Sequence, residues 1–251
     1  MVELFNVTLY QPIFNGFVAL YNLIPDVGVV ILIITILLKA VLYPFTKKSI
    51  KAQKALTDLQ PKLEEIKEKN KGDQQKIAQE TMALYKEHKV NPLGSCLPLL
   101  IQIPVFLALY WVLRDAFSGD DFTQLYSFVK NPEHLNPVTL GLFDLSNQSI
   151  VLALLAGGAQ FFQARMFTKK RAPQKAGAAS KDENMTAMMN KQMTYFMPII
   201  TVLIGFQLPG GLALYWFLST LITGLQQLVI FKKNEPTKPD VIEGHVIEEK
   251  K

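Results

Sequence analysis

Five long apolar blocks alternate with polar segments along this chain. They cover residues 27–45, 95–113, 149–167, 193–208 and 210–231. A helix needs about 20 mostly apolar residues to cross the hydrocarbon core of a bilayer. The overall composition agrees, since 49% of the residues are hydrophobic and the mean hydropathy is +0.19. We therefore expect an all-α polytopic membrane protein with five transmembrane helices.

Residues 1–26 are moderately apolar, but asparagines, a glutamine and two prolines interrupt them. Their apolar side chains follow helical spacing, and Pro12 suits the first turn of a helix. We expect a short helix in the outer membrane interface, and Pro25 separates it from the first span.

Residues 46–94 are strongly polar and divide at Gly72-Asp73, where glycine ends one helix and aspartate caps the next. Each half carries a narrow apolar stripe, which predicts a helical hairpin outside the membrane. An ordinary charged loop is the alternative. The hairpin positions that support the prediction are Pro61, Leu63, Ile66, Ile77 and Leu84.

The distribution of lysine and arginine predicts the orientation. Eleven of these residues lie in 47–92, six in 168–192 and five in 232–251, but only two in 114–148 and none in 1–26. Basic residues favour the cytoplasmic side, so we expect the N-terminus outside and the C-terminus in the cytoplasm. Residues 114–148 then form an extracytoplasmic loop, 168–192 a cytoplasmic loop and 232–251 a disordered tail. Topology accounts for the net charge of +5 without direct nucleic-acid reading.

The predicted spans contain no aspartate, glutamate or histidine. Intramembrane proteases and most proton relays need such residues within the membrane. The three histidines lie far apart, and the lone Cys96 excludes an intramolecular disulfide. We expect no catalytic residue, metal ion or cofactor, and hence no enzyme.

Lys39 is the one cation well inside a predicted span, roughly 9 Å from its cytoplasmic end at 1.5 Å per residue. A charge near the membrane centre costs about 2.5–3.5 kcal/mol. Either a wetted polar cavity accommodates Lys39, or its stem snorkels to the surface. Neutral polar residues are scattered through the spans and could line such a cavity, bridge helices or bond their own backbone. They include Thr35, Gln102, Gln160, Gln163 and Thr201, with Gln226 and Gln227 expected among the headgroups.

Several motifs resemble the YidC-type membrane protein insertase family. The most specific is Asn91-Pro92-Leu93-Gly94, which runs into the second apolar block. Others are Leu59-Gln60-Pro61-Lys62, Phe196-Met197-Pro198 and the stretch from Leu208 to Trp216. The resemblance covers residues 8–233 and all five predicted spans in order.

The resemblance implies a five-helix core around a hydrophilic groove that opens to the cytoplasm and to lipid. It also implies that the protein inserts, folds and helps to assemble membrane proteins without consuming nucleotide. Its substrates would be nascent membrane proteins in the plasma membrane of a bacterial-type cell, with the Sec translocon and the ribosome as further candidate partners. The groove cation, normally arginine, aligns with Lys39, the groove aromatic with Trp216, and a polar groove residue with Gln160 or Gln163.

Two functions of other classes remain open from the residues alone. A small channel or transporter usually shows internal repeats, and we find none in this chain. A structural assembly subunit would use the same polar side chains only to pack helices together. Contact between a nascent chain and the surroundings of Lys39 and Trp216 separates an insertase from such a subunit.

Overall fold

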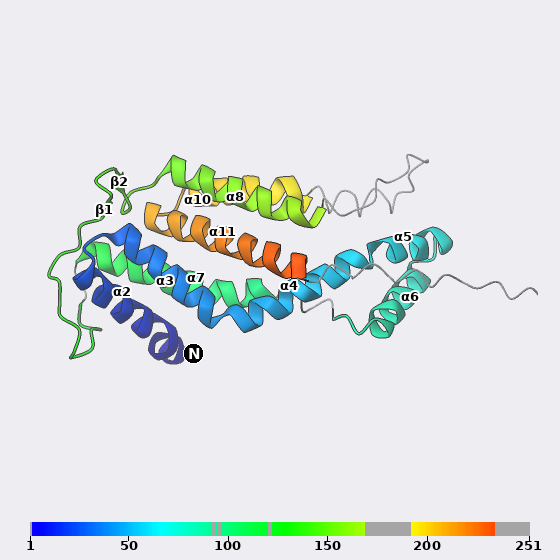
Figure 1. Ribbon diagram of the computed structural model, residues 1–251, viewed down its shortest axis with the longest axis horizontal. Helices are drawn as coiled ribbons and strands as arrows, with labels where there is room; N and C mark the ends of the chain where they lie inside the picture. Colours follow the sequence, from blue (N-terminus) through cyan, green and yellow to red (C-terminus); the bar gives the residue numbers. More distant parts are fainter. Residues whose placement is uncertain (1, 92–93, 95–96, 120–121, 169–191, 234–251) are drawn as a thin grey trace, which may run out of the picture.

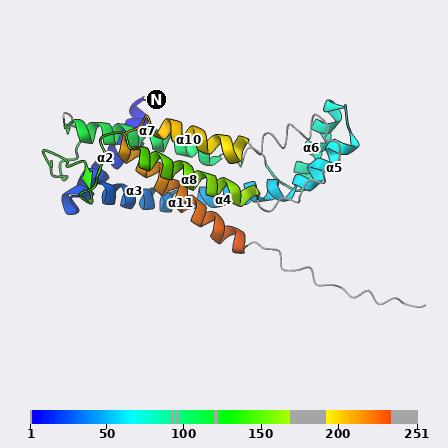
Figure 2. The ribbon, with the colours of Figure 1, turned by 90° about the horizontal axis from the view of Figure 1, so that it is seen from above.

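The structure is a computed structural model that describes residues 2–91, 94, 97–119, 122–168 and 192–233. Long helices run side by side along one axis, and a smaller helical hairpin stands at one end (Figures 1 and 2). Cys96, most of the predicted cytoplasmic loop 168–192 and nearly all of the tail 232–251 lie outside the described residues. The bundle helices are α3 (Val27–Val41), α7 (Leu97–Ser118), α8 (Ile150–Thr168), α10 (Met197–Gly205) and α11 (Gly210–Lys233).

Two of these helices are long and apolar enough to cross a membrane, over Leu100–Ser118 and Gly210–Phe231. α3 and α4 (Tyr43–Asp58) form a bent pair, and if the two helices together are counted as one span, it is the third. Shorter apolar helices cover Ile150–Met166 and Thr194–Gly205. Length and composition alone therefore mark two or three spans in the part of the chain that the structure describes.

The first apolar block does not form one straight helix. α3 ends at Val41, and the chain turns by 69° before α4. Pro44 lies in the first turn of α4 and has no N–H to donate to the carbonyl of Ala40, which a continuous helix would require. The helix that begins this block therefore ends four residues before Phe45, the predicted end of the span.

The polar segment after α4 contains α5 (Gln60–Lys69) and α6 (Gln74–Glu87), which contact one another. Gly72 has φ 91°, and the Asp73 carboxylate accepts a hydrogen bond of 3.0 Å from the N–H of Lys76. Each helix contributes one buried leucine, Leu63 or Leu84, to this hairpin. Of the other predicted hairpin positions, Ile66 and Ile77 are half-buried and Pro61 is exposed.

The N-terminal segment forms α1 (Val2–Phe5), the π-helix η1 (Asn6–Tyr10) and α2 (Gln11–Leu23). We expected a helix in the outer membrane interface, and this segment is indeed helical, but one apolar face is covered by protein. It packs against α3 and α7, and Phe14, Phe17 and Val18 are completely buried. These side chains of α2 thus belong to the core of the bundle.

α7 continues past Leu113, the predicted end of the second span, to Ser118, and a loop follows it. This loop contains a two-stranded antiparallel hairpin of β1 (Val138–Thr139) and β2 (Phe143–Asp144), which the sequence pattern did not reveal. The buried Asn15 amide binds the loop backbone, donating to the carbonyl of Gln124 at 3.0 Å and accepting from the N–H of Tyr126 at 2.6 Å. The amide therefore holds the loop against α2.

Asp26 joins this loop to the start of α3. Its carboxylate caps α3 by accepting from the N–H of Val29 at 3.1 Å, and it also accepts from the Thr139 hydroxyl and from the N–H of Leu140 at 2.8 Å. Burial raises the pKa of Asp26, but these hydrogen bonds outweigh it and hold the pKa below the ordinary 3.8. Ionisation of the Asp26 carboxyl group thus stabilises the folded state.

The helices α8 and α10 approach closely at glycine. A Cβ atom at Gly157 would lie 2.3 Å from Cγ2 of Val202 and 3.0 Å from the carbonyl oxygen of Pro198. The neighbouring Gly158 has no such neighbour within 4 Å. The π-helix η3 (Gln192–Phe196) precedes α10 and also contacts α8.

We expect Gly157→Ala to lower the thermal unfolding temperature in detergent, because the added methyl group must push α10 away from α8. Overpacking of this kind costs about 1–3 kcal/mol. Gly158→Ala is the matched control and should leave the temperature unchanged or raise it. Equal melting temperatures for the two variants would contradict the close approach.

We expect Asp26→Asn to destabilise the protein by about 1 kcal/mol at pH 7, because the neutral amide can still cap α3 but loses the negative charge and one of the two acceptor oxygens. A carboxylate with a lowered pKa contributes stability above its ordinary pKa, and this stability is lost as the pH falls through the folded-state value. The difference between parent and variant should therefore shrink between pH 6 and pH 3. Thermal unfolding in detergent, with the exposed Asp58→Asn as control, measures it.

Candidate functional site

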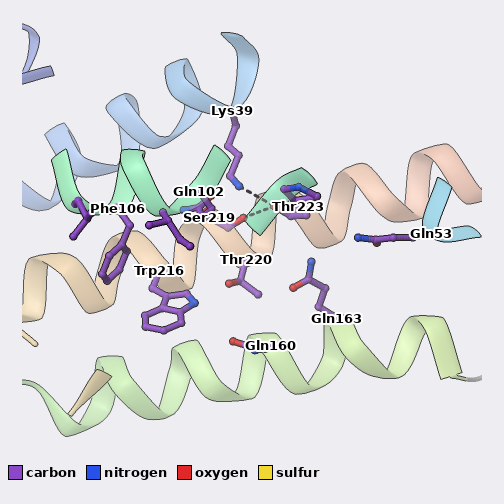
Figure 3. Close-up of a pocket in the computed structure, with 13 residues that line it drawn as sticks. Lys39, Gln53, Gln102, Phe106, Gln160, Gln163, Trp216, Ser219, Thr220 and Thr223 are labelled. Carbon is purple, nitrogen blue, oxygen red and sulfur yellow. Dashed lines mark hydrogen bonds between the residues drawn. The ribbon is translucent and has the colours of Figure 1, made fainter. Parts of the chain in front are cut away.

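A cavity of about 510 Å³ lies between α3, α7, α8 and α11, with one contribution from α4 (Figure 3). Five of the six predicted groove residues line it together, although they come from four different helices. Its wall consists of Lys39, Gln53, Pro98, Gln102, Ile103, Phe106, Leu107, Gln160, Gln163, Trp216, Ser219, Thr220 and Thr223.

Lys39 is half-buried and reaches across the cavity to α11 (Figure 3). Its Nζ donates a 3.0 Å hydrogen bond to the hydroxyl of Thr223, which in turn donates to the carbonyl of Ser219 at 2.8 Å. The lysine stem therefore does not snorkel along its own helix to the surface. Among the described residues, the ammonium group binds a neutral oxygen and meets no carboxylate.

Two neutral side chains of the cavity wall are fixed by partners behind it. Gln102 donates to the hydroxyl of Tyr215 at 2.6 Å, and Tyr215 is almost completely buried. Gln160 accepts from the hydroxyl of Thr201 at 2.5 Å. Tyr215 was missed by the sequence analysis, because an aromatic residue in an apolar helix gives no sign of a polar partner.

Aromatic and aliphatic side chains form the rest of the wall. Phe106 packs edge to face on Trp216, with the ring centroids 5.4 Å apart. Ile103 and Leu107 line the cavity and are 48% and 46% exposed, so the cavity is open along α7. Towards the other end of the bundle the side chains fill the core. Ile31, Leu109, Leu113 and Leu212 are all buried there.

Thr35 does not line the cavity. It is completely buried and donates its hydroxyl hydrogen bond to the carbonyl of Ile31 at 2.6 Å, within its own helix. This threonine needs no cavity to satisfy its hydroxyl group.

Gln226 and Gln227 also differ from expectation. Gln227 is only 3% exposed, and the side-chain carbonyl oxygens of both residues are buried without a hydrogen-bond partner among the described residues. The carbonyl oxygens of both side chains therefore face the protein. They extend the polar positions of α11 one turn beyond Thr223.

The arrangement contains one cation, several amides and hydroxyls, and an aromatic border. Within the described residues, no group of three or more histidine, cysteine, aspartate or glutamate side chains could hold a metal ion. A wall of this kind can keep a polar or acidic peptide segment solvated.

The family and the relatives that match this chain agree with one another. Residues 19–238 match the family described as the 60Kd inner membrane protein. The chain is 38% identical over 206 residues to a membrane protein insertase YidC of Fusobacterium nucleatum, covering 82% of this chain and 86% of that one. It is 35% identical over 227 residues to the YidC insertase of Tolumonas auensis, covering 90% of this chain. It spans only 36% of the Tolumonas protein.

A solved structure is also similar. It is described as an active YidC insertase crystal structure with the first transmembrane domain resolved. The TM-score is 0.56 at 27% sequence identity, and the match covers 88% of this chain and 46% of the solved chain.

We expect the cavity to contain water. With Cys96 replaced by serine, Gln163→Cys in membrane vesicles should react with a membrane-impermeant maleimide, because Gln163 lines the cavity. Thr35→Cys should react far more slowly, since Thr35 is completely buried. Equal protection of both cysteines would show that the cavity is dry.

Proposed function

The chain belongs to the YidC family of membrane protein insertases, and we propose that it inserts, folds and helps to assemble integral membrane proteins without nucleotide hydrolysis. It is not an enzyme in the catalytic sense. The observation that carries the proposal is the cavity in which Lys39, Gln102, Gln160, Gln163 and Trp216 meet.

The proposed arrangement in a bacterial inner membrane has five spans, formed by α3, α7, α8, α10 with η3, and α11. The short helices α8 and α10 pack on one another, and α8 also packs on α11, which is long and apolar enough to span; this packing supports counting both as spans. The charge distribution supports an extracytoplasmic N-terminus and a cytoplasmic C-terminus.

In this arrangement, the cavity shortens the apolar path that a translocated segment must cross. The hydrocarbon core is about 30 Å thick, and polar groups inside a hydrated cavity keep hydrogen-bond partners for part of that distance. The half-buried ammonium group of Lys39 attracts acidic residues of the segment. A membrane potential that is negative inside favours their outward movement by about 2.3 kcal/mol per charge per 100 mV.

The apolar segment of the substrate leaves sideways into lipid. The exposed side chains of Ile103 and Leu107 form an apolar edge of the cavity on α7, and they support a lateral exit. The hairpin of α5 and α6 is joined to the bundle through α4, and in this proposal it receives the substrate on the cytoplasmic side. The Sec translocon and the ribosome are candidate partners on that side.

We expect Lys39→Ala to reduce the insertion of substrates with acidic translocated tails at least several-fold, because Lys39 is the one cation among the described residues that line the cavity. Lys39→Arg should retain insertion if the role is a positive charge. The assay follows protease protection of individual substrates in cells depleted of the endogenous insertase. Thr35→Val serves as the control, since it alters a buried hydroxyl outside the cavity.

Full insertion of several acidic substrates by Lys39→Ala would contradict the proposal. A structural assembly subunit would instead show normal insertion with failed complex formation. A channel would show solute flux in proteoliposomes that lack a substrate protein.

A further inference from the structure

The hairpin of β1 and β2 exposes an unusual amount of apolar surface for an extracytoplasmic loop. Leu140 and Leu142 flank Gly141 at its tip and are 71% and 77% exposed. Val138 and Phe143, in the two strands, are also more than one-third exposed. Contiguous exposed apolar side chains usually mark a contact surface.

The backbone conformation at the tip indicates that the side chain of Leu140 has a role of its own. Leu142 donates its N–H to the carbonyl of Thr139 at 3.0 Å, and the two residues between them have φ values of 50° and 68°. Such a turn favours asparagine followed by glycine, because a leucine with positive φ is strained. Leu140 occupies the first position despite this cost, which indicates that its side chain has a use outside the turn.

The hairpin is held at the level where a membrane helix begins. The Asp26 carboxylate, which caps α3, accepts from the N–H of Leu140 and the hydroxyl of Thr139. Gly28, in the first turn of α3, leaves room for this contact, since a Cβ atom there would overlap the Thr139 side chain. The tip cannot move far from α3 without breaking these bonds.

The chain then leads directly to another membrane-facing surface. β2 is followed by α8, whose first turns expose Ile150, Val151 and Leu154 by 53–56%. Figure 1 shows the hairpin at the end of the molecule where α3 and α8 begin. The exposed tip and the exposed start of α8 therefore belong to one end of the bundle.

The distribution of charged residues also agrees with an apolar surface at the tip. Asp144 is the only formally charged residue between 138 and 150, and it lies at the base of the hairpin. Its carboxylate accepts from the N–H and the hydroxyl of Ser146, at 2.8 and 2.6 Å, and from the Asn147 amide. The tip itself is uncharged.

We propose that the tip of the hairpin, Leu140 to Leu142, inserts into the boundary between headgroups and acyl chains of the extracytoplasmic leaflet. The occupant of this apolar surface is thus lipid. The inserted tip anchors the extracytoplasmic loop to the bilayer and, through Asp26, fixes the depth at which α3 begins. This role is independent of substrate insertion by the cavity.

Spin labels test the proposal in proteoliposomes of phosphatidylethanolamine and phosphatidylglycerol. With Cys96 replaced by serine, single cysteines are placed at Leu142, at Leu154 as the lipid reference and at His134 as the water reference. We expect the label at 142 to resemble that at 154, with access to oxygen and little access to a water-soluble nickel chelate. If the label at 142 resembles the label at 134, the proposal is overturned. The proposal is also overturned if the label at 142 is shielded from the nickel chelate only after a second protein is added, because the occupant would then be protein and not lipid.

A second variant separates the side chain from the fold. Leu140→Asn creates the Asn-Gly pair that this turn favours, so we expect an unchanged or higher unfolding temperature in detergent. In proteoliposomes, the same change should move the label at 142 towards the aqueous chelate. An unchanged accessibility profile would show that Leu140 does not hold the tip in the membrane, and would overturn the proposal.

Discussion

The hydrogen bond from Lys39 to Thr223 satisfies a requirement on which the surrounding bundle depends. An ammonium group in an apolar helix must find hydrogen-bond acceptors, and the described part of the chain offers it no carboxylate. α11 supplies a hydroxyl, while glutamines from α7 and α8 complete a polar wall. The side chains cannot fill this space as they fill the core near Leu109 and Leu212, and a cavity remains.

The cavity residues were predictable to different degrees. Gln160 and Gln163 are three residues apart, so helical spacing alone places them on one face of α8. Their meeting with Lys39 and Trp216 depends on how α3, α8 and α11 pack, and only the family resemblance anticipated it. Thr35 lies one turn before Lys39, and spacing cannot tell that its hydroxyl group binds its own helix.

The fold shows the same division. Apolar blocks predicted the bundle helices because burial or lipid contact needs long apolar runs, and Gly72 and Asp73 marked the turn of the hairpin correctly. The strands β1 and β2 were not predicted, since two residues each are too few for an alternating pattern. The amphipathic pattern of α2 fits a membrane interface and a protein core equally well, and only the contacts with α3 and α7 decide between them.

The bend before α4 also has an electrostatic consequence. Because α3 ends at Val41, Lys39 falls in the last turn of this helix. The aligned peptide dipoles of a helix place about half a negative charge at its C-terminus, which stabilises a cation there by about 0.3–1 kcal/mol. Had the helix continued to Phe45, its negative end would lie a turn further from the ammonium group. By ending the helix here, Pro44 thus provides Lys39 with part of the counter-charge that no acidic side chain in the described part of the chain supplies.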